Sequence, residues 1–257
     1  MGAPLVLLDI TDQIAVLTLN NPQRRNALSR PLLESLRERL AQVAADPGVH
    51  VVVLRAEGPV FSSGHDLREL VGGREEDYAC LFALCTEVME AVRQLPQPVI
   101  AEVQGLATAA GCQLAATCDL VVASTAAAFA TPGVMIGLFC TTPAVALCRA
   151  VPSKKALEML LTGNPISAAE AERVGLVNRV VSPDRLHDEA MGLARQIAAA
   201  SRATVALGKR AFYRQLPLDR PAAYKVAQQV MVANALAPAA REGIGAFLEK
   251  RAPNWPE

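Results

Sequence analysis

Two short stretches of small residues could hold an oxygen atom between backbone amides. The first, Ser62–Asp66, reads Ser-Ser-Gly-His-Asp, and the second, Ala109–Gly111, reads Ala-Ala-Gly. Small side chains let a backbone approach a ligand closely, and the first N–H groups of a helix have no partner within the helix. Such amides can stabilise a carbonyl oxygen that gains negative charge during a reaction. Tight packing of a helix on a strand, without any ligand, is the alternative explanation of these residues.

Each stretch follows an apolar run that predicts a buried strand. His50–Arg55, His-Val-Val-Val-Leu-Arg, precedes the first stretch, and Val99–Val103, Val-Ile-Ala-Glu-Val, precedes the second. We expect a helix to begin near Ala109 or Ala110, so that its unpaired amides point at the turn. Two strand ends that each present an exposed amide could then hold one oxygen from two sides.

The rest of the pattern predicts strands that alternate with helices, and therefore an α/β fold with a mostly parallel sheet. Val6–Ile10 and Ile14–Leu19 flank a polar turn and predict an antiparallel hairpin. Ser29 is placed to cap a helix that runs to about Asp46. Further helices are expected at Asp77–Leu95, Arg185–Ala200, Arg202–Arg214, Pro221–Ala235 and Ala240–Lys250.

Composition narrows the class of protein. The 257 residues, 52% of them hydrophobic, suffice for one large domain or one domain with a helical extension. Lys and Arg together number 25, as do Asp and Glu together, and the sequence contains no basic block. This charge pattern argues against nucleic acid as a partner and against an electrostatic contact with a membrane. No uncharged apolar run approaches about 18 residues, so no membrane span is expected. The six cysteines form no Cys-x-x-Cys pair, so we expect no metal site and no disulfide scaffold.

The chain resembles the enoyl-CoA hydratase/isomerase (crotonase) superfamily along almost its whole length, from Asn20–Pro22 to Phe247–Lys250. It is most similar to the subgroup of mitochondrial enoyl-CoA hydratase domain-containing proteins and their bacterial relatives. The segments that carry the resemblance are Gly58–Leu67 (Gly-Pro-Val-Phe-Ser-Ser-Gly-His-Asp-Leu), Gly105–Leu114 (Gly-Leu-Ala-Thr-Ala-Ala-Gly-Cys-Gln-Leu), Phe129–Val134, Gly137–Cys140 and Leu161–Val177.

This resemblance implies the crotonase fold, a spiral of ββα units, at residues 1–195, followed by a C-terminal helical region at 196–257. It implies that the C-terminal helices build a homotrimer, or a dimer of trimers, and reach toward a neighbour's site. Phe247 would pack there beside the acyl-CoA, and Lys250 would approach its phosphates. Packing of these helices on the chain's own core is the alternative.

The resemblance also implies an acyl-CoA thioester as ligand, with coenzyme A carried by the substrate and no separate cofactor or metal. The oxyanion hole would consist of the backbone N–H groups of His65 and Ala110, a position where glycine is usual and alanine keeps the amide. Arg24 and Arg25 suit the phosphates, although a solvated basic turn explains them equally well. The positions that match coenzyme A contacts are Arg24, Arg25, Ala27, Ser63, His65, Asp66, Leu67, Ala110, Phe247 and Lys250.

Two positions depart from the family's hydratases. The glutamates that position water and move protons in those enzymes align with Gln113 and Gly133. Glutamine takes no proton near neutral pH, and glycine has no side chain. Because one acid–base group contributes typically about 10²–10⁴-fold, we expect hydration to be very slow. The position where other members carry a catalytic aspartate aligns with Thr141, which is not a base either.

His65 and Cys140 are the remaining candidates for chemistry around this pocket, together with Thr131, Thr141 and Thr142. The imidazole of His65 titrates in the range needed for proton exchange, or else only its amide serves and the ring turns to solvent or coenzyme A. Cys140 would be a nucleophile only as a thiolate, and a buried inert thiol is the alternative.

Three functions remain open from the sequence. The chain could be a lyase or isomerase of fatty-acid metabolism, a decarboxylase of malonyl- or methylmalonyl-type thioesters, or an acyl-CoA-binding protein without catalysis. Decarboxylation would use the oxyanion hole and need no base, because loss of CO₂ generates the enolate directly. The first 20 residues show neither a secretion signal nor a transit pattern, so we expect a cytoplasmic protein, with a processed mitochondrial form as the alternative.

Overall fold

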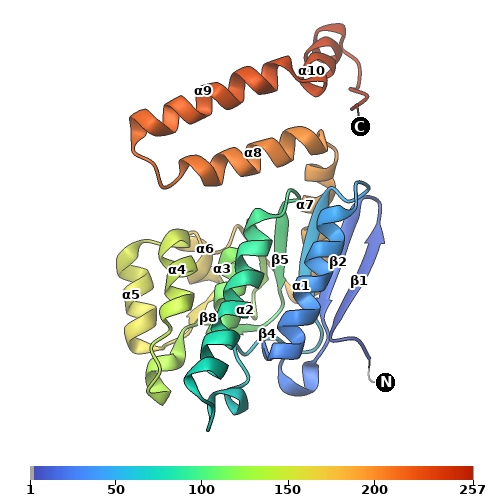
Figure 1. Cartoon of the computed structure of the whole chain (residues 1–257). Coiled ribbons are helices and arrows are strands. Elements are labelled where there is room, and N and C mark those ends of the chain that lie inside the picture. Colours follow the sequence, from blue (N-terminus) through green and yellow to red (C-terminus); the bar gives the residue numbers. More distant parts are fainter. Residues whose placement is uncertain (1–2, 257) are drawn as a thin grey trace.

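The computed structural model of the chain describes residues 3–256 and contains two sheets (Figure 1). The larger has the strand order β1-β2-β3-β5-β7-β10, in which β1 and β2 form the predicted hairpin and all other neighbours are parallel. The predicted α/β fold is therefore confirmed. Its strands are β1 (Val6–Thr11), β2 (Ile14–Leu19), β3 (Val51–Ala56), β5 (Val99–Val103), β7 (Leu120–Ser124) and β10 (Arg179–Val181).

Helices bury both faces of this sheet, which explains the unbroken apolar runs of its central strands. In β3, Val51 and Val53 pack with residues of α7 (Leu186–Ala198), whereas Val52 and Leu54 belong to the main core. This alternation follows from the two-residue period of a strand. The main core also contains the apolar faces of α1 (Arg30–Ala45) and α2 (Glu75–Gln94).

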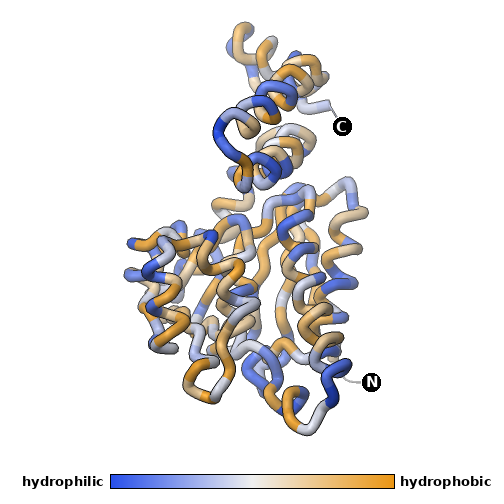
Figure 2. The backbone as a smooth tube through the Cα atoms, turned by 60° about the vertical axis from the view of Figure 1, so that its left-hand side comes forward, coloured by the Kyte–Doolittle hydropathy of each residue, from blue (hydrophilic) through white to orange (hydrophobic). Residues whose placement is uncertain are grey.

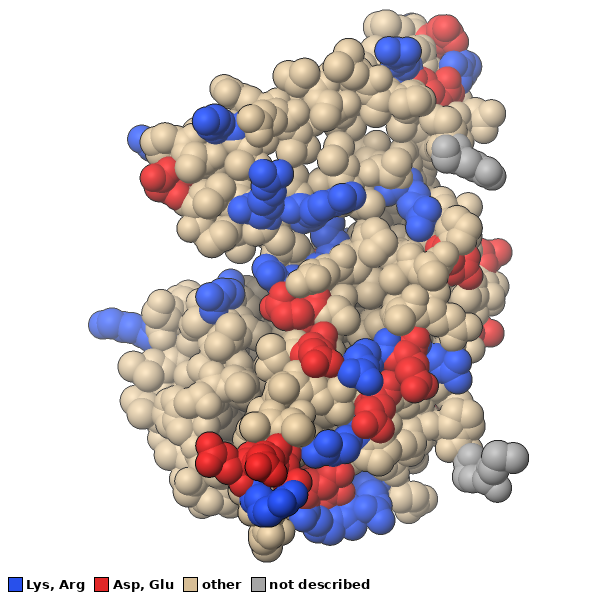
Figure 3. All heavy atoms as spheres, viewed as in Figure 1, with Lys and Arg blue, Asp and Glu red and all other residues tan. Residues whose placement is uncertain are grey.

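Helices α1 and α2 pack against each other at the surface of the core. Arg37 of α1 donates a hydrogen bond to Glu87 of α2 at 2.8 Å, between two exposed side chains. Figure 3 shows acidic and basic side chains interleaved on this part of the molecule, rather than one large field of a single sign. Such exposed pairs contribute little to stability, so the buried stripes of the two helices hold them in place.

The smaller sheet has four strands in the order β4-β6-β8-β9. Strands β4, β6 and β8 run parallel, and β9 is antiparallel to β8. The sequence pattern did not predict β4 or β6, because three residues are too few to show a two-residue period. The order strand, strand, helix recurs in β3-β4-α2 and β5-β6-α3 (Ala110–Thr117), as the spiral of ββα units requires. The four strands are β4 (Val60–Ser62), β6 (Leu106–Thr108), β8 (Ala128–Ala130) and β9 (Ile166–Ser167).

Three helices at the C-terminal end form a layer outside the two sheets (Figure 1). They are α8 (Arg202–Gln215), α9 (Arg220–Leu236) and α10 (Pro238–Glu249). Figure 2 shows hydrophobic stretches along them, and α8 and α9 contain no buried residue within one chain. The expected boundary at residue 195 remains a prediction, and this residue lies within α7. No helix within residues 3–256 is long and apolar enough to cross a membrane.

Lys209 joins α8 to the core. Its ammonium donates to the backbone oxygens of Val92 and Gln97 and to the carboxylate of Asp119 at 2.6 Å. Tyr213, one turn later, donates to the other oxygen of Asp119 at 2.8 Å. This partly buried ion pair fixes the helical layer over the start of β5.

The remaining helices are short and lie between the strands or beside the smaller sheet. They are η1 (Pro22–Arg24), η2 (Leu67–Leu70), η3 (Pro132–Ile136), α4 (Thr141–Ala150), α5 (Ser153–Thr162), α6 (Ala168–Arg173) and η4 (Pro183–Arg185).

Candidate functional site

The carboxyl ends of β4, β6 and β8 meet at one edge of the smaller sheet, because these neighbouring strands are parallel. β4 leads into Ser63–Asp66, β6 into Ala109 and α3, and β8 into Thr131–Gly133. The structure therefore brings together both stretches that the sequence singled out, and adds a third. The expected donors follow β4 and β6, rather than directly following the longer strands β3 and β5.

The backbones of the two expected oxyanion-hole loops touch. A Cβ atom built on Gly64 would lie 2.8 Å from the Cβ of Ala109 and 3.1 Å from the backbone nitrogen of Ala110, so only glycine fits there. Ala110 is the first residue of α3, and His65 follows Gly64. Within residues 3–256, neither the His65 nor the Ala110 amide donates a hydrogen bond to another backbone or side-chain group. Both amides thus lack an acceptor within the part of the chain that the structure describes.

Ala109 turns the chain sharply before α3. It has φ 51° and ψ −120°, a conformation that side chains rarely adopt and that favours glycine. Its own amide donates to the carbonyl of Ala130 at 2.9 Å, which fixes the turn to the end of β8. Strain held in this way orients the following amide, that of Ala110. This role of Ala109 was not predictable from the sequence, because alanine is not a residue expected at positive φ.

The arginine-bearing loop docks directly beside the first of these turns. The Ser63 amide donates to the carbonyl of Arg25 at 3.0 Å, and the Leu28 amide donates to that of Gly64 at 2.7 Å. Asn26, fully buried at positive φ, fixes the loop further through side-chain bonds to the carbonyls of Glu57 and Val60, both 2.8 Å. The structural role of Asn26 was not predicted, although asparagine in a turn-rich loop is a recognised residue for the left-handed region.

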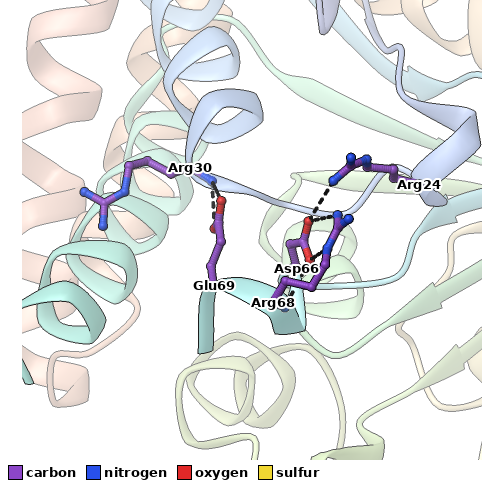
Figure 4. Close-up of polar contacts among 5 residues, drawn as sticks. All are labelled: Arg24, Arg30, Asp66, Arg68 and Glu69. Carbon is purple, nitrogen blue, oxygen red and sulfur yellow. Dashed lines mark hydrogen bonds and ion pairs between the residues drawn. The ribbon is translucent and has the colours of Figure 1, made fainter. Parts of the chain in front are cut away.

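The charged residues of this loop are partly paired with each other (Figure 4). Asp66 accepts hydrogen bonds from the Arg68 guanidinium and lies 3.6 Å from that of Arg24. The Arg68 guanidinium holds the pKa of the Asp66 carboxyl below its usual range. Glu69 accepts the backbone N–H of Arg30 at 3.0 Å, so it caps α1 in place of the predicted Ser29 side chain. Asp66 and Glu69 thus hold neighbouring parts of the chain together.

The ring of His65 points into the protein. Its Nδ1 lies 3.2 Å from the carbonyl oxygen of Leu28, and its edge packs on Phe82 of α2, with ring centroids 5.5 Å apart. Burial lowers the pKa of the imidazole, so the ring is neutral at pH 7, and its Nε2 has no partner among the described residues. Of the expected alternatives, a ring turned to solvent is therefore wrong, because the Leu28 carbonyl and Phe82 hold the ring inside, and a ring turned toward coenzyme A stays a prediction.

Gln113 lies on α3 three residues after Ala110, on the same face of the helix. It is 6% exposed, and its Oε1 has no hydrogen-bond partner within residues 3–256. The hydroxyls of Thr108, at the end of β6, and Thr131, after β8, are also buried without partners. The sequence analysis named Gln113 and Thr131 but not Thr108.

The Sγ of Cys140 lies in the space into which a side chain on Gly133 would project. A Cβ atom on Gly133 would lie 2.8 Å from the Sγ of Cys140 and 2.5 Å from the carbonyl oxygen of Leu138. Burial raises the pKa of the Cys140 thiol, which therefore stays protonated near neutral pH and is not a nucleophile. Of the neighbouring candidates, Thr141 is exposed and begins α4.

Two of the expected contacts lie elsewhere in a single chain. Phe247, 81% exposed, and Lys250 are on and after α10, which packs on α8 and α9. In Figure 1, α10 lies at the top of the view and β4 near the bottom, on opposite sides of the larger sheet's upper edge. By contrast, Ala27 is buried in the loop that docks on Gly64, and Leu67 begins the exposed segment η2.

Comparison with known proteins finds relatives of this chain both by sequence and by structure. The family model described as enoyl-CoA hydratase/isomerase matches residues 9–257. "Enoyl-CoA hydratase domain-containing protein 3, mitochondrial" is 55% identical in Rattus norvegicus, over 95% of this chain and 82% of that protein, and 53% identical in Homo sapiens, over 95% and 81%. The crystal structure of the enoyl-CoA hydratase from Mycobacterium smegmatis has a TM-score of 0.96 at 50% identity, covering 98% of this chain and 99% of that one. That of human enoyl Coenzyme A hydratase domain-containing protein 3 has a TM-score of 0.95 at 51% identity, covering 98% and 100%.

Proposed function

Because the chain belongs to the enoyl-CoA hydratase/isomerase family and has the crotonase fold, we propose that it binds an acyl-CoA thioester at the edge of the smaller sheet. The thioester oxygen accepts hydrogen bonds from the backbone amides of His65 and Ala110. One observation carries this proposal: two unpartnered amides come from loops that touch at Gly64.

Such an arrangement stabilises an enolate. When a proton or a carboxylate leaves the α-carbon, negative charge moves onto the thioester oxygen, and preorganised amides stabilise it without reorganisation. One such donor is worth about 2.7–4 kcal/mol in comparable acyl-transfer sites. The dipole of α3, whose first residue is Ala110, adds a partial positive charge at the same point.

The loop at Arg24–Ala27 supports coenzyme A binding beside this hole. The Arg24 guanidinium lies 3.6 Å from the Asp66 carboxylate, whereas Arg25 is exposed and makes no ion pair within residues 3–256. Both guanidinium groups suit phosphate oxygens. Ser63, whose amide holds the carbonyl of Arg25, places this loop next to the acyl site.

Ordinary hydration is expected to be very slow. Gln113 and Gly133, which match the positions of the two catalytic glutamates in the family's hydratases, offer no titratable group. The neutral ring of His65 is engaged with the Leu28 carbonyl, and the Cys140 thiol is protonated. In this proposal the oxyanion hole works without the usual proton carriers.

The same absence of a base favours decarboxylation as the second candidate reaction. A malonyl- or methylmalonyl-type thioester would form its enolate by losing CO₂, and the two amides would supply most of the stabilisation. Binding of acyl-CoA without turnover is the third candidate.

Self-association as a homotrimer, or as a dimer of trimers, would bring Phe247 and Lys250 to a neighbour's site. The helical layer supports this proposal, because Phe247, Leu248 and Met231 are 81%, 73% and 62% exposed in one chain. Light scattering should give the mass of three or six chains, and a monomer would contradict the proposal. On location, the relatives named above carry "mitochondrial" in their names, which supports a mitochondrial form and gives the cytoplasmic expectation no support.

Incubation with crotonyl-, malonyl- and methylmalonyl-CoA, followed by mass spectrometry, separates the three candidates. We expect binding of acyl-CoA and a crotonyl-CoA turnover far below the median enzyme value of about 10 s⁻¹. Ala110→Pro removes one amide at a helix position that tolerates proline, and it should abolish any turnover, whereas Ala110→Gly keeps the amide and should retain it. Turnover of crotonyl-CoA at an ordinary hydratase rate would contradict the proposed lack of proton carriers.

A further inference from the structure

The segment that follows α10 folds back along this helix, and the chain end marked C lies beside α10 in Figure 1. We call this segment, Arg251–Trp255, the strap. The Arg251 guanidinium donates two hydrogen bonds to the Glu242 carboxylate, at 2.6 and 3.1 Å, and one to Glu249 at 2.6 Å. The Asn254 amide donates to the same Glu242 carboxylate at 2.6 Å. Because Glu242 lies two turns before the end of α10, these bonds hold the strap against the helix.

Trp255 joins the strap to the end of α7. Its indole N–H donates to the carbonyl of Ala199, the residue after α7, at 2.8 Å. On α10, a Cβ atom built on Gly243 would lie 3.1 Å from the indole ring, so the ring lies where a side chain at this position would project. Of the residues of α10, all of which the structure describes, only Ala239 and Ala246 are buried. Because these two side chains are small, the indole contributes much of the contact that holds α10 in place.

Lys250 lies where α10 ends and the strap begins. It has φ 54° and ψ 40°, a left-handed conformation that side chains other than glycine rarely adopt. The amide of the next residue, Arg251, donates to the carbonyl of Ala246 at 3.0 Å and fixes this turn. Strained conformations persist where the surrounding structure enforces them, and they gather at functional sites. The strap therefore fixes the backbone that carries the Lys250 side chain.

The charges around Lys250 leave only its own ammonium available to an anion. Every guanidinium nitrogen of Arg251 donates to a carboxylate of Glu242 or Glu249, whereas the Lys250 side chain makes no ion pair within residues 3–256. The Arg251 guanidinium and the Asn254 N–H lower the pKa of the Glu242 carboxyl to about 2. The pair thus stays ionised near neutral pH, and the strap remains closed there.

We propose that Glu242, Arg251 and Trp255 are positioning residues, which hold Lys250 ready to bind the phosphates of coenzyme A. This inference rests on the proposed acyl-CoA binding and on the proposed approach of Lys250 to those phosphates. The three positioning residues do not touch the ligand. A lysine on a fixed backbone loses less conformational freedom on binding than one on a mobile segment, so it binds its ligand more tightly. Release of the strap should therefore weaken binding through Lys250.

Gly243→Leu is designed to displace the strap, because its side chain takes the place of the Trp255 ring. Gly245→Leu is the matched control on the same helix, since a Cβ atom there has no listed neighbour within 4 Å. Trp255 is the single tryptophan, so its fluorescence reports the strap directly. Gly243→Leu should shift the emission to the red and increase quenching by acrylamide, and Gly245→Leu should do neither.

Isothermal titration calorimetry of the whole chain with butyryl-CoA measures the consequence for binding. Gly243→Leu should raise the dissociation constant about 5–10-fold, as expected for losing part of a charge-assisted contact, and Gly245→Leu should leave it unchanged. Trp255→Ala, which leaves α10 itself intact, should give the same loss as Gly243→Leu. In a Lys250→Met background, Gly243→Leu should change the dissociation constant less than about twofold, because the two changes act on one contact.

The outcomes separate this inference from the function on which it rests. If Lys250→Met binds butyryl-CoA as tightly as the native chain, the proposed phosphate contact is refuted, and the inference with it. If Lys250→Met weakens binding but Gly243→Leu and Trp255→Ala do not, the phosphate contact stands and only the inference is refuted. An equal loss from Gly243→Leu with and without Lys250 would also overturn it, since the strap would then act on the fold as a whole. Unchanged fluorescence in Gly243→Leu would contradict the described position of Trp255.

Discussion

The sulfur of Cys140 fills the space into which a side chain on Gly133 would project. A Cβ atom on Gly133 would lie 2.8 Å from this sulfur and 2.5 Å from the carbonyl oxygen of Leu138. The Leu138 amide in turn donates to the carbonyl of Gly133 at 2.9 Å, so the two backbone segments are fixed to each other. The structure thus has no room for a carboxylate side chain at Gly133.

Gly133→Ala should therefore destabilise the protein. Overpacking of this kind costs typically about 1–3 kcal/mol, and the backbone oxygen of Leu138 cannot rotate away. Urea unfolding measures the change. Gly192→Ala is the control, because Gly192 lies in α7 with open space around it, and the substitution should stabilise by about 0.5–1 kcal/mol. A Gly133→Ala variant as stable as the native chain would contradict the packing described.

Gln113→Glu should raise the rate of crotonyl-CoA hydration. The change keeps the size of the side chain and supplies one acid–base group beside the free amide of Ala110, which is worth about 10²-fold or more. Gly133→Glu should give no gain, for lack of room. Initial rates by absorbance measure both, with Gln94→Glu at the end of α2 as the control. Equal rates for Gln113→Glu and the native chain would show that Gln113 does not face the acyl group.

His65 should make folding stability depend on pH. Its pKa is lowered below 6.5 by burial, so the unfolded chain binds a proton more readily than the folded chain. The contribution is fully present above about pH 6.5, and it is lost as the pH falls from there toward the folded pKa. In His65→Gln, which cannot titrate, the melting temperature should fall less between pH 7 and pH 5. The same fall in both proteins would contradict the buried neutral ring.

Lys209→Met should loosen the helical layer. The change leaves the Asp119 carboxylate without its cation at 2.6 Å, and breaking a buried pair from one side costs about 3–5 kcal/mol. Adding Asp119→Asn should recover part of the loss, since no buried charge then remains. Lys225→Met, on the exposed side of α9, is the control and should change little. Denaturant unfolding is measured for the native chain, Lys209→Met, Asp119→Asn, the double variant and Lys225→Met, and additive effects of the two changes would argue against the pairing.

The sequence predicted the elements whose hydrophobic pattern extends over several consecutive residues. Apolar runs predict strands at His50–Arg55 and Val99–Val103, and both are confirmed, the first as β3 at Val51–Ala56. The expected start of α3 at Ala110 is confirmed. The smaller sheet escaped because its strands have two or three residues and are defined by partners far along the chain.

The site was predictable where the backbone alone supplies function. The contact of Gly64 with Ala109 and Ala110 follows from small residues at two strand ends, which the sequence displays. The inward ring of His65 was not predictable, because it depends on Leu28 and Phe82, which come from other elements. The lack of space for a side chain on Gly133 was not predictable either, since it arises from the path of the chain between Gly133 and Cys140.

Two ligands that differ only in the thioester oxygen test whether the amides of His65 and Ala110 bind this oxygen. Butyryl-CoA has the oxygen, and the thioether S-butyl-CoA lacks it. Two net hydrogen bonds predict a dissociation constant for butyryl-CoA about 10–30-fold lower, and a ratio of about 3–5 in Ala110→Pro, which keeps the His65 amide. Equal affinities of the native protein for the two ligands would contradict the account.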